Sequence, residues 1–157
     1  MRRSDREITD KDELISVIRK CDVCRIALND GGYPYIIPLN FGFCEKDGSM
    51  KFYFHSALEG KKLDLIKKDP RAGFELDCSH MLQYFEEKGY CTMAYKSVVG
   101  TGRINILDDN EKTDALNLLM KQYHPEGYAG YDPAAMSRTT VFCLTVESIT
   151  GKKKNPK

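Results

Sequence analysis

The junction between a predicted strand and a predicted helix, FYFHSALEGKKLDLIKKDP at residues 52–70, gathers residue types that bind phosphate. A phosphate monoester needs cations, hydroxyl donors and free backbone N–H groups, which the start of a helix supplies. Lys61 and Lys62 place charge in that first turn, and Gly60 permits a close backbone approach. His55 and Ser56 lie where the strand ends and can face the same point. The pattern predicts a phosphate site; the alternative is two solvated lysines, which oppose the helix dipole.

The cysteine and histidine spacing predicts no metal site. Cys21 and Cys24 form a CxxC pair, but a zinc or redox role needs a second ligand pair or a thioredoxin-like context. Cysteine is by default a small buried apolar residue, and we expect all six thiols to be reduced. His80 and His124 fall in loop-like or helix-end sequence, where surface roles are expected. Arg25 lies in a strand, where we expect it to pair with a carboxylate, though it could reach a cofactor anion.

Length and composition predict one domain over residues 1–157, with residues 152–157 as a flexible lysine-rich tail. The net charge of +1 gives no global field that would favour nucleic acid as a partner. No apolar run approaches the roughly 20 residues of a membrane span, and the N-terminus MRRSDREITD lacks the apolar centre of a signal peptide. We therefore expect a cytoplasmic protein without a membrane partner.

The elements that position the junction are mostly strands. Thr9 can cap a first helix whose apolar residues recur at helical spacing, and Asp108 or Asp109 can cap a later one. The segment 33–43 contains two prolines, so it should be an edge, a bulged strand or two short pieces. Residues 79–89 fit no pattern, and residues 121–137 read as a loop. Further strands are predicted at 23–28, 50–55, 72–77, 94–107 and 139–146. Hairpins dominate, which predicts a mainly β protein with flanking helices, closed as a small antiparallel barrel.

Four motifs in a fixed order carry a family resemblance. They are CRIALNDGGYPYIIPLNFGF, KFYFHSALEGKKLDLIKKDPRAGFEL, YKSVVGTGRINIL and, after a helix, ESITGK. In this order the chain resembles the FMN-binding split β-barrel family related to pyridoxamine 5′-phosphate oxidase. It is most similar to the nitroimidazole-resistance (Nim-type) branch. The resemblance implies an antiparallel split β-barrel.

The resemblance also implies a cofactor, FMN, and its contacts. Lys61 and Lys62 match the residues that hold the FMN phosphate, and His55 is the candidate proton donor. The positions that line the phosphate and ribityl chain are Phe54, His55 and Ser56. The strand along the flavin ring matches Pro38, Leu39, Asn40 and Phe41. The segment that closes the site, often from the second subunit, matches Ser97, Val98 and Val99. The resemblance implies a homodimer with FMN at its interface.

The implied activity is that of an FMN-dependent oxidoreductase. Electrons would come from a donor such as NAD(P)H and pass to a small-molecule substrate, for which a nitroimidazole-type nitro compound is the family analogy. True pyridoxamine phosphate oxidases carry an arginine-rich strand and a C-terminal Arg-Leu segment that this chain lacks, so vitamin B6 oxidation is not expected. One alternative is a flavin, haem or deazaflavin binding or sensing module, in which His55 could ligate haem. Another is a structural dimer with a vestigial pocket.

Overall fold

The computed structural model describes residues 3–127 and 130–156. Within these residues the strands are β1 Glu7–Ile8, β2 Cys24–Leu28, β3 Tyr35–Leu39, β4 Gly42–Lys46, β5 Ser49–Ala57, β6 Arg71–Phe85, β7 Tyr90–Ile106 and β8 Thr139–Lys154. The helices are α1 Lys11–Lys20, α2 Lys61–Lys68, α3 Asp109–Tyr123 and α4 Pro133–Met136, with 3-10 turns η1 Ser4–Arg6 and η2 Glu86–Lys88. None of the helices in these ranges has the length and apolar composition needed to cross a membrane.

The strands form one antiparallel sheet in the order β3-β2-β6-β7-β8-β5-β4, and β1 pairs with the C-terminal end of β8. β3 and β4 follow one another in the chain but occupy opposite edges of this order. Only Asn40 and Phe41 separate the two edge strands along the chain. The sheet therefore curves until its two edge strands, β3 and β4, come close together. These two strands do not pair with each other, so the barrel is open between them. This confirms the predicted antiparallel split β-barrel with flanking helices.

Aromatic side chains fill the barrel. Phe41, Phe52, Phe54 and Phe142 are fully buried, and the ring centroids of Phe54 and Phe142 lie 5.3 Å apart. Burying a phenylalanine side chain stabilises the fold by about 1.5–3 kcal/mol, so this group anchors β4, β5 and β8. One face of α1 joins the same core through Leu14, Val17 and Ile18.

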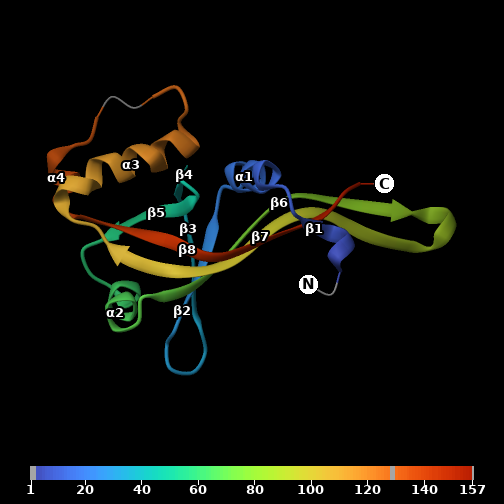
Figure 1. The fold of residues 1–157 in the computed structure, drawn as a ribbon, viewed down its shortest axis with the longest axis horizontal. Coiled ribbons are helices and arrows are strands. Elements are labelled where there is room, and N and C mark those ends of the chain that lie inside the picture. The colour runs from blue at the N-terminus through green and yellow to red at the C-terminus, as the bar shows by residue number, and fades with distance from the viewer. Residues whose placement is uncertain (1–2, 128–129, 157) are drawn as a thin grey trace.

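Helices cover two sides of the barrel. Figure 1 shows α3 and α4 on one side and α2 on the other. α3 packs closely on β4, because a Cβ atom at Gly42 would lie 2.4 Å from the backbone nitrogen of Leu119. No side chain larger than hydrogen fits there without moving the helix. α3 begins with a capping box at Asp108, which is one of the two N-cap residues predicted for this helix.

Two predicted boundaries at the chain ends are wrong. The cap of α1 is Asp10 rather than Thr9, because the Asp10 carboxylate accepts a hydrogen bond of 2.7 Å from the Glu13 backbone N–H. The tail predicted at residues 152–157 is strand as far as Lys154, which pairs with Tyr95 of β7. A lysine run suggested a solvated tail, but backbone pairing and an ion pair of 2.6 Å from Lys153 to Glu13 order it. Lys157 lies outside the described residues.

The segment 79–89, which fitted no pattern, completes a long hairpin. β6 continues to Phe85 and β7 begins at Tyr90, well before the predicted start at residue 94. We call residues 81–94 the β6–β7 arm; Figure 1 shows it projecting from the barrel. The predicted loop at residues 121–137 instead contains the end of α3 and the short α4. The segment 33–43 is two short strands, one of the three predicted forms.

Candidate functional site

The predicted phosphate site lies where β5 leads into α2. Gly60 is the N-cap of α2 and has a φ of +139°, a conformation that favours glycine, and no side chain caps the helix. The first helical donors are the backbone N–H groups of Leu63 and Asp64, which reach the Gly60 carbonyl at 2.9 and 3.3 Å. The N–H groups of Lys61 and Lys62 precede these donors and belong to the unsatisfied start of the helix. The backbone here suits an anion.

The two lysines of the junction have different surroundings. Lys61 Nζ makes an ion pair of 2.5 Å with Asp30 and lies 5.0 Å from the ring centroid of Tyr35. The hydrogen bond to Asp30 raises the pKa of Lys61. Lys62 is half-buried and makes no ion pair with the carboxylates of the described residues. Lys62 is therefore the uncommitted cation, whereas Lys61 must share its charge with Asp30.

His55 lies close enough to Lys62 to respond to its charge. The imidazole reaches solvent, but partial desolvation, followed by the positive charge of Lys62, lowers its pKa below the ordinary value of 6.5. His55 is therefore mainly neutral at pH 7, with one nitrogen able to donate and one able to accept a hydrogen bond. Ser56 Oγ donates to the Ala57 carbonyl at 2.8 Å. Phe54 is fully buried, so only its backbone could contact a ligand.

The segment predicted to lie along a flavin ring joins the two edges of the barrel. Pro38 is exposed and Leu39 half-buried, whereas the Phe41 side chain is fully buried. The Asn40 amide, expected to face a ligand, donates to the Asp22 carbonyl at 3.2 Å. The Tyr123 hydroxyl accepts from the Phe41 N–H at 3.0 Å and donates to the Asp22 carbonyl at 2.7 Å. We call these two hydrogen bonds of the Tyr123 hydroxyl, to Phe41 and to Asp22, the bracket. Sequence reasoning missed this bracket, which fixes the backbone of the segment.

Ser97, Val98 and Val99 do not meet the junction within this chain. The position of each strand along β8 shows this: His55 pairs with Val141, but Ser97 pairs with Lys152. Val141 and Lys152 are eleven positions apart in β8, which corresponds to about 36 Å along a strand. Ser97 is half-buried and Val99 46% exposed, whereas Val98 is fully buried and belongs to the core. The structure therefore leaves the predicted site in two separate parts.

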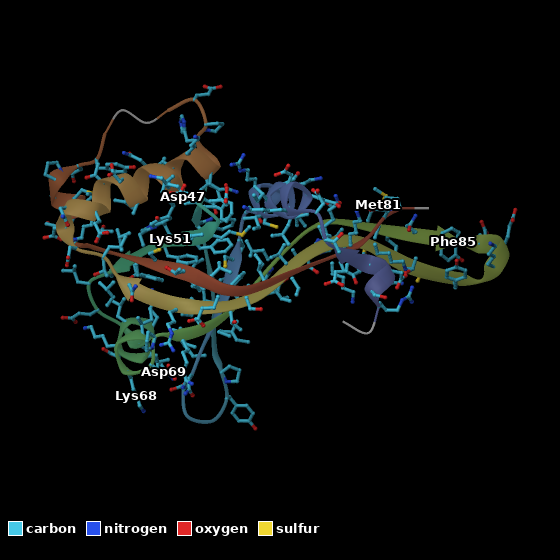
Figure 2. The ribbon with its side chains drawn as sticks, viewed as in Figure 1. Asp47, Lys51, Lys68, Asp69, Met81 and Phe85 are labelled. Carbon is cyan, nitrogen blue, oxygen red and sulfur yellow. The ribbon has the colours of Figure 1, made fainter. Side chains whose placement is uncertain are left out.

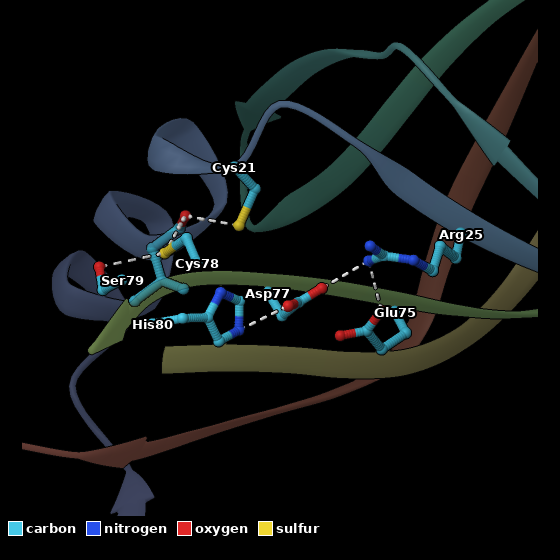
Figure 3. A network of polar contacts seen from close by, with 8 residues as sticks. Cys21, Arg25, Glu75, Asp77, Cys78, Ser79 and His80 are labelled. Carbon is cyan, nitrogen blue, oxygen red and sulfur yellow. Dashed lines mark hydrogen bonds and ion pairs between the residues drawn. The ribbon is translucent and has the colours of Figure 1, made fainter. Parts of the chain in front are cut away.

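A polar network that sequence reasoning did not find lies near Ser97. Figure 3 shows Arg25 between two carboxylates, with Nη1 at 3.0 Å from Glu75 and 2.5 Å from Asp77. Asp77 also contacts His80 Nε2 at 2.7 Å. Desolvation, together with the charge of Asp77, raises the pKa of Glu75. Arg25 is thus paired with carboxylates, as predicted, and His80 lies at the surface, as predicted. Asp77 connects the two side chains, and it lies 52 positions from Arg25 in the sequence.

The CxxC cysteines are buried. The Cys21 thiol donates to the Val17 carbonyl at 3.2 Å, and its neighbour across the fold is Cys78. Burial raises the pKa of both Cys21 and Cys24, which keeps these thiols protonated and unreactive. The described residues contain no group of three or more histidine, cysteine or carboxylate side chains arranged to hold a metal ion.

A groove of about 520 Å³ lies on the outer side of β2, β6 and β7. Ala27, Gly73 and Thr101 line it, and none of the predicted site residues does. Arg71 stands at its rim, but two hydrogen bonds, of 2.9 and 2.8 Å, tie its guanidinium to Asp69. Among the described residues Lys62 makes no ion pair, so the junction is a stronger candidate for anion binding than this groove.

Comparison with solved structures shows where the fold recurs. The chain is 29% identical to a provisionally assigned 5-nitroimidazole antibiotic resistance protein from Bacteroides thetaiotaomicron, with a TM-score of 0.80 over 94% of this chain and 86% of that one. A FAD and haem binding protein from Mycobacterium smegmatis is 16% identical, with a TM-score of 0.79 over 96% and 74%. A flavocytochrome from Azotobacter vinelandii is 15% identical, with a TM-score of 0.78 over 99% and 72%. At these last two identities the likeness shows the fold alone.

The sequence matches a family model rather than a curated protein. No curated protein matches it significantly. The family model described as pyridoxamine 5′-phosphate oxidase matches residues 10–153, which is nearly the whole chain and includes both parts of the predicted site. The chain therefore belongs to the pyridoxamine 5′-phosphate oxidase family.

Proposed function

We propose that this protein binds FMN and acts as an FMN-dependent oxidoreductase on a small acceptor, such as a nitroimidazole-type nitro compound. The observation that carries the proposal is the uncommitted Lys62 at the start of α2, beside Lys61 and a His55 whose pKa is lowered. Family membership and the similarity to the Bacteroides thetaiotaomicron protein support the choice of cofactor and acceptor. Bound flavin would supply the electron transfer.

The junction residues fit the phosphate of that cofactor. Lys62 offers a charged donor that has no acidic partner among residues 3–127 and 130–156, whereas Lys61 has to loosen its contact with Asp30. The open helix start adds backbone N–H donors, and nothing lies within 4 Å of a Cβ position at Gly60. Charged hydrogen bonds contribute about 1.5–3 kcal/mol each, so three or four approach the roughly 8 kcal/mol of micromolar binding.

The other residues have orienting roles in the proposal. The bracket between Tyr123, Phe41 and Asp22 holds the backbone of residues 38–41 in a fixed position, where it can lie along a flat ring. His55 is mainly neutral in the free protein, and a phosphate beside it would raise its lowered pKa, so His55 is the candidate proton donor near the ligand. The second part of the site, Ser97 and Val99, would come from another subunit, because about 36 Å of strand separates it from the junction. The proposal therefore includes a homodimer with FMN between its subunits.

The donor we propose is NAD(P)H or a small redox protein. We place the activity in the cytoplasm, where the six cysteines, all unpaired in this structure, would remain reduced. The test is to purify the protein, record its visible spectrum, identify any released chromophore, and then follow NAD(P)H oxidation with a 5-nitroimidazole. Bound FMN and acceptor-dependent oxidation support the proposal; bound FMN without turnover with any donor overturns its catalytic half.

A second candidate is a flavin, haem or deazaflavin binding module without turnover. The names of two structural neighbours, a FAD and haem binding protein and a flavocytochrome, favour testing it. In that case His55, which is exposed and mainly neutral, would be the residue that ligates the haem iron. A Soret band in the purified protein that is lost in a His55→Ala variant would support this candidate over the first.

A further inference from the structure

A cavity of about 360 Å³ lies between α1, β4 and α3. Arg19, in the last turn of α1, and Lys121, in the last turn of α3, both line it. Phe43 of β4 and Leu118 of α3 are half-buried and form its apolar wall. Figure 2 shows Lys68 of α2 on the opposite side of the barrel from α3, so this cavity is separate from the predicted phosphate site at the start of α2.

The two cations of this cavity have no acidic partner. Within residues 3–127 and 130–156, neither the Arg19 guanidinium nor the Lys121 ammonium makes an ion pair or a hydrogen bond. Glu45 supplies a carboxylate to the cavity wall, but it makes an ion pair of 2.7 Å with Lys11. The hydrogen bond from Lys11 also lowers the pKa of Glu45, so this carboxylate is ionised and already paired. The cavity therefore keeps two cations whose charge is not balanced, and such a cavity attracts anions.

The end of α1 is capped without these cations. The helix dipole favours a cation in a last turn, so either residue alone would not indicate a site. In this fold the Gln122 side-chain Nε2 donates to the backbone carbonyls of Arg19 and Cys21, at 3.0 Å each. The Tyr123 hydroxyl donates to the next carbonyl, that of Asp22. The carbonyl groups at the end of α1 are thus satisfied by side chains of α3, which leaves the two cations free for a ligand.

The walls of the cavity are held in place before any ligand binds. α3 packs so closely on β4 that a Cβ atom at Gly42 would lie 2.6 Å from the backbone carbonyl carbon of Leu118. The Phe43 ring packs on Phe52 of the core, with ring centroids 5.2 Å apart. Because a preorganised wall loses little conformational freedom on binding, a small number of charged contacts is enough for measurable affinity.

We infer that this cavity binds a small aromatic carboxylate, with the carboxylate between the two cations and the ring against Phe43 and Leu118. Arg19 offers a planar fork of donors that matches a carboxylate, and Lys121 adds a second charge. The half-buried apolar wall favours an anion with an apolar body over a bare inorganic anion, and contact with the Phe43 ring favours an aromatic body. The cavity volume lies at the lower end for small-molecule sites, which suits a single ring.

Isothermal titration calorimetry of the purified protein with benzoate tests the inference. We expect a Kd of about 0.1–1 mM, the affinity that two charged hydrogen bonds supply. Arg19→Gln and Lys121→Gln should each raise that Kd about tenfold or more, because each removes one charged hydrogen bond. Benzamide, which has the same ring but no charge, and inorganic phosphate, which has charge but no ring, should each bind at least about tenfold more weakly than benzoate.

Two controls locate the bound benzoate. Lys20→Gln removes the same charge from the last turn of α1 at a residue that does not line the cavity, so it should leave the Kd within about twofold. Cys44 lines the cavity and is half-buried, whereas Cys91 on the β6–β7 arm is exposed. Benzoate at ten times its Kd should therefore slow alkylation of Cys44 by iodoacetamide about tenfold, by mass action. Alkylation of Cys91 should be unchanged, with both sites read by peptide mass spectrometry.

Circular dichroism shows that each variant is folded before its Kd is interpreted. The inference is overturned by no benzoate binding up to about 10 mM, or by equal binding of benzamide or inorganic phosphate. A Kd unchanged in either Arg19→Gln or Lys121→Gln, equal weakening by Lys20→Gln, or an unprotected Cys44 would also overturn it. The inference goes beyond the proposed function and does not depend on bound flavin. A colourless protein that binds benzoate as described supports the inference and counts against flavin binding, whereas a yellow protein that does not bind benzoate does the reverse.

Discussion

Removing the two lysines at the start of α2 should abolish tight FMN binding while leaving riboflavin binding unchanged. Riboflavin has the same ring and ribityl chain but no phosphate, so it reports on the rest of the site. Lys62 has no acidic partner in the described residues, so Lys62→Ala should cost a full charged hydrogen bond of about 1.5–3 kcal/mol. That cost corresponds to a Kd about 10- to 150-fold weaker.

Lys61→Ala should have a smaller effect, because Lys61 already shares its charge with Asp30 at 2.5 Å and is 55% exposed. The double variant should therefore bind FMN about 10²- to 10³-fold more weakly than the wild type. Asp30→Asn should act in the opposite direction and strengthen FMN binding a few-fold, since it releases Lys61 toward the phosphate. Lys61→Ala and Asp30→Asn should therefore change the Kd for FMN in opposite directions, although the two residues are partners in the same ion pair.

The assay is quenching of flavin fluorescence on titration with apoprotein, at two salt concentrations because exposed charges are screened. The matched control is Lys67→Ala, Lys68→Ala, which removes the same charge from the last turn of the same helix. If the control weakens FMN as much as the lysine pair at the start, the effect is general electrostatics and the site assignment is refuted. A double variant that loses riboflavin and FMN equally would refute the phosphate contact specifically.

Three further perturbations test the surroundings of the site. Gly42→Ala should destabilise the fold by about 1–3 kcal/mol, because its Cβ would lie 2.4 Å from Leu119 N, whereas Gly32→Ala meets nothing within 4 Å; equal thermal midpoints would contradict this. Tyr123→Phe removes both bracket hydrogen bonds and should cost about 1–3 kcal/mol in urea unfolding; no change would show that the bracket is dispensable. A phosphate beside His55 should raise its lowered pKa, so FMN binding should tighten about two- to fivefold from pH 8 to 6.5. His55→Gln should remove that dependence, and a variant with an unchanged pH profile would exclude His55 as its source.

Local sequence signals predicted the junction well because its structure is local. Gly60, the lysines and the apolar spacing of Leu63, Leu65 and Ile66 specify the start and buried face of α2 within eight residues. Asp69 and Pro70 end the helix where predicted, since the residue before a proline disfavours helical geometry. The error at α1 was equally local: Thr9 and Asp10 are both good caps, and only the side-chain geometry decides between them.

Features that depend on strand register could not be predicted in this way. Large apolar residues of the β6–β7 arm are exposed, among them Met81, Leu82 and Tyr84. The arm therefore lacks the alternation of buried apolar and exposed polar positions that is typical of a strand. The contacts of Arg25 with Glu75 and Asp77 require the pairing of β2 with β6, which no local pattern encodes. The separation of Ser97 from His55 likewise depends on where each strand pairs along β8.

The most direct test of the central claim is the visible absorption spectrum of the purified protein, followed by release and identification of the chromophore. The account predicts a flavin spectrum, with FMN as the released compound. If the protein is colourless as purified, incubation with FMN should produce the same spectrum. A protein that remains colourless after that incubation would contradict the account, and the lysines at the start of α2 would then be solvated surface residues.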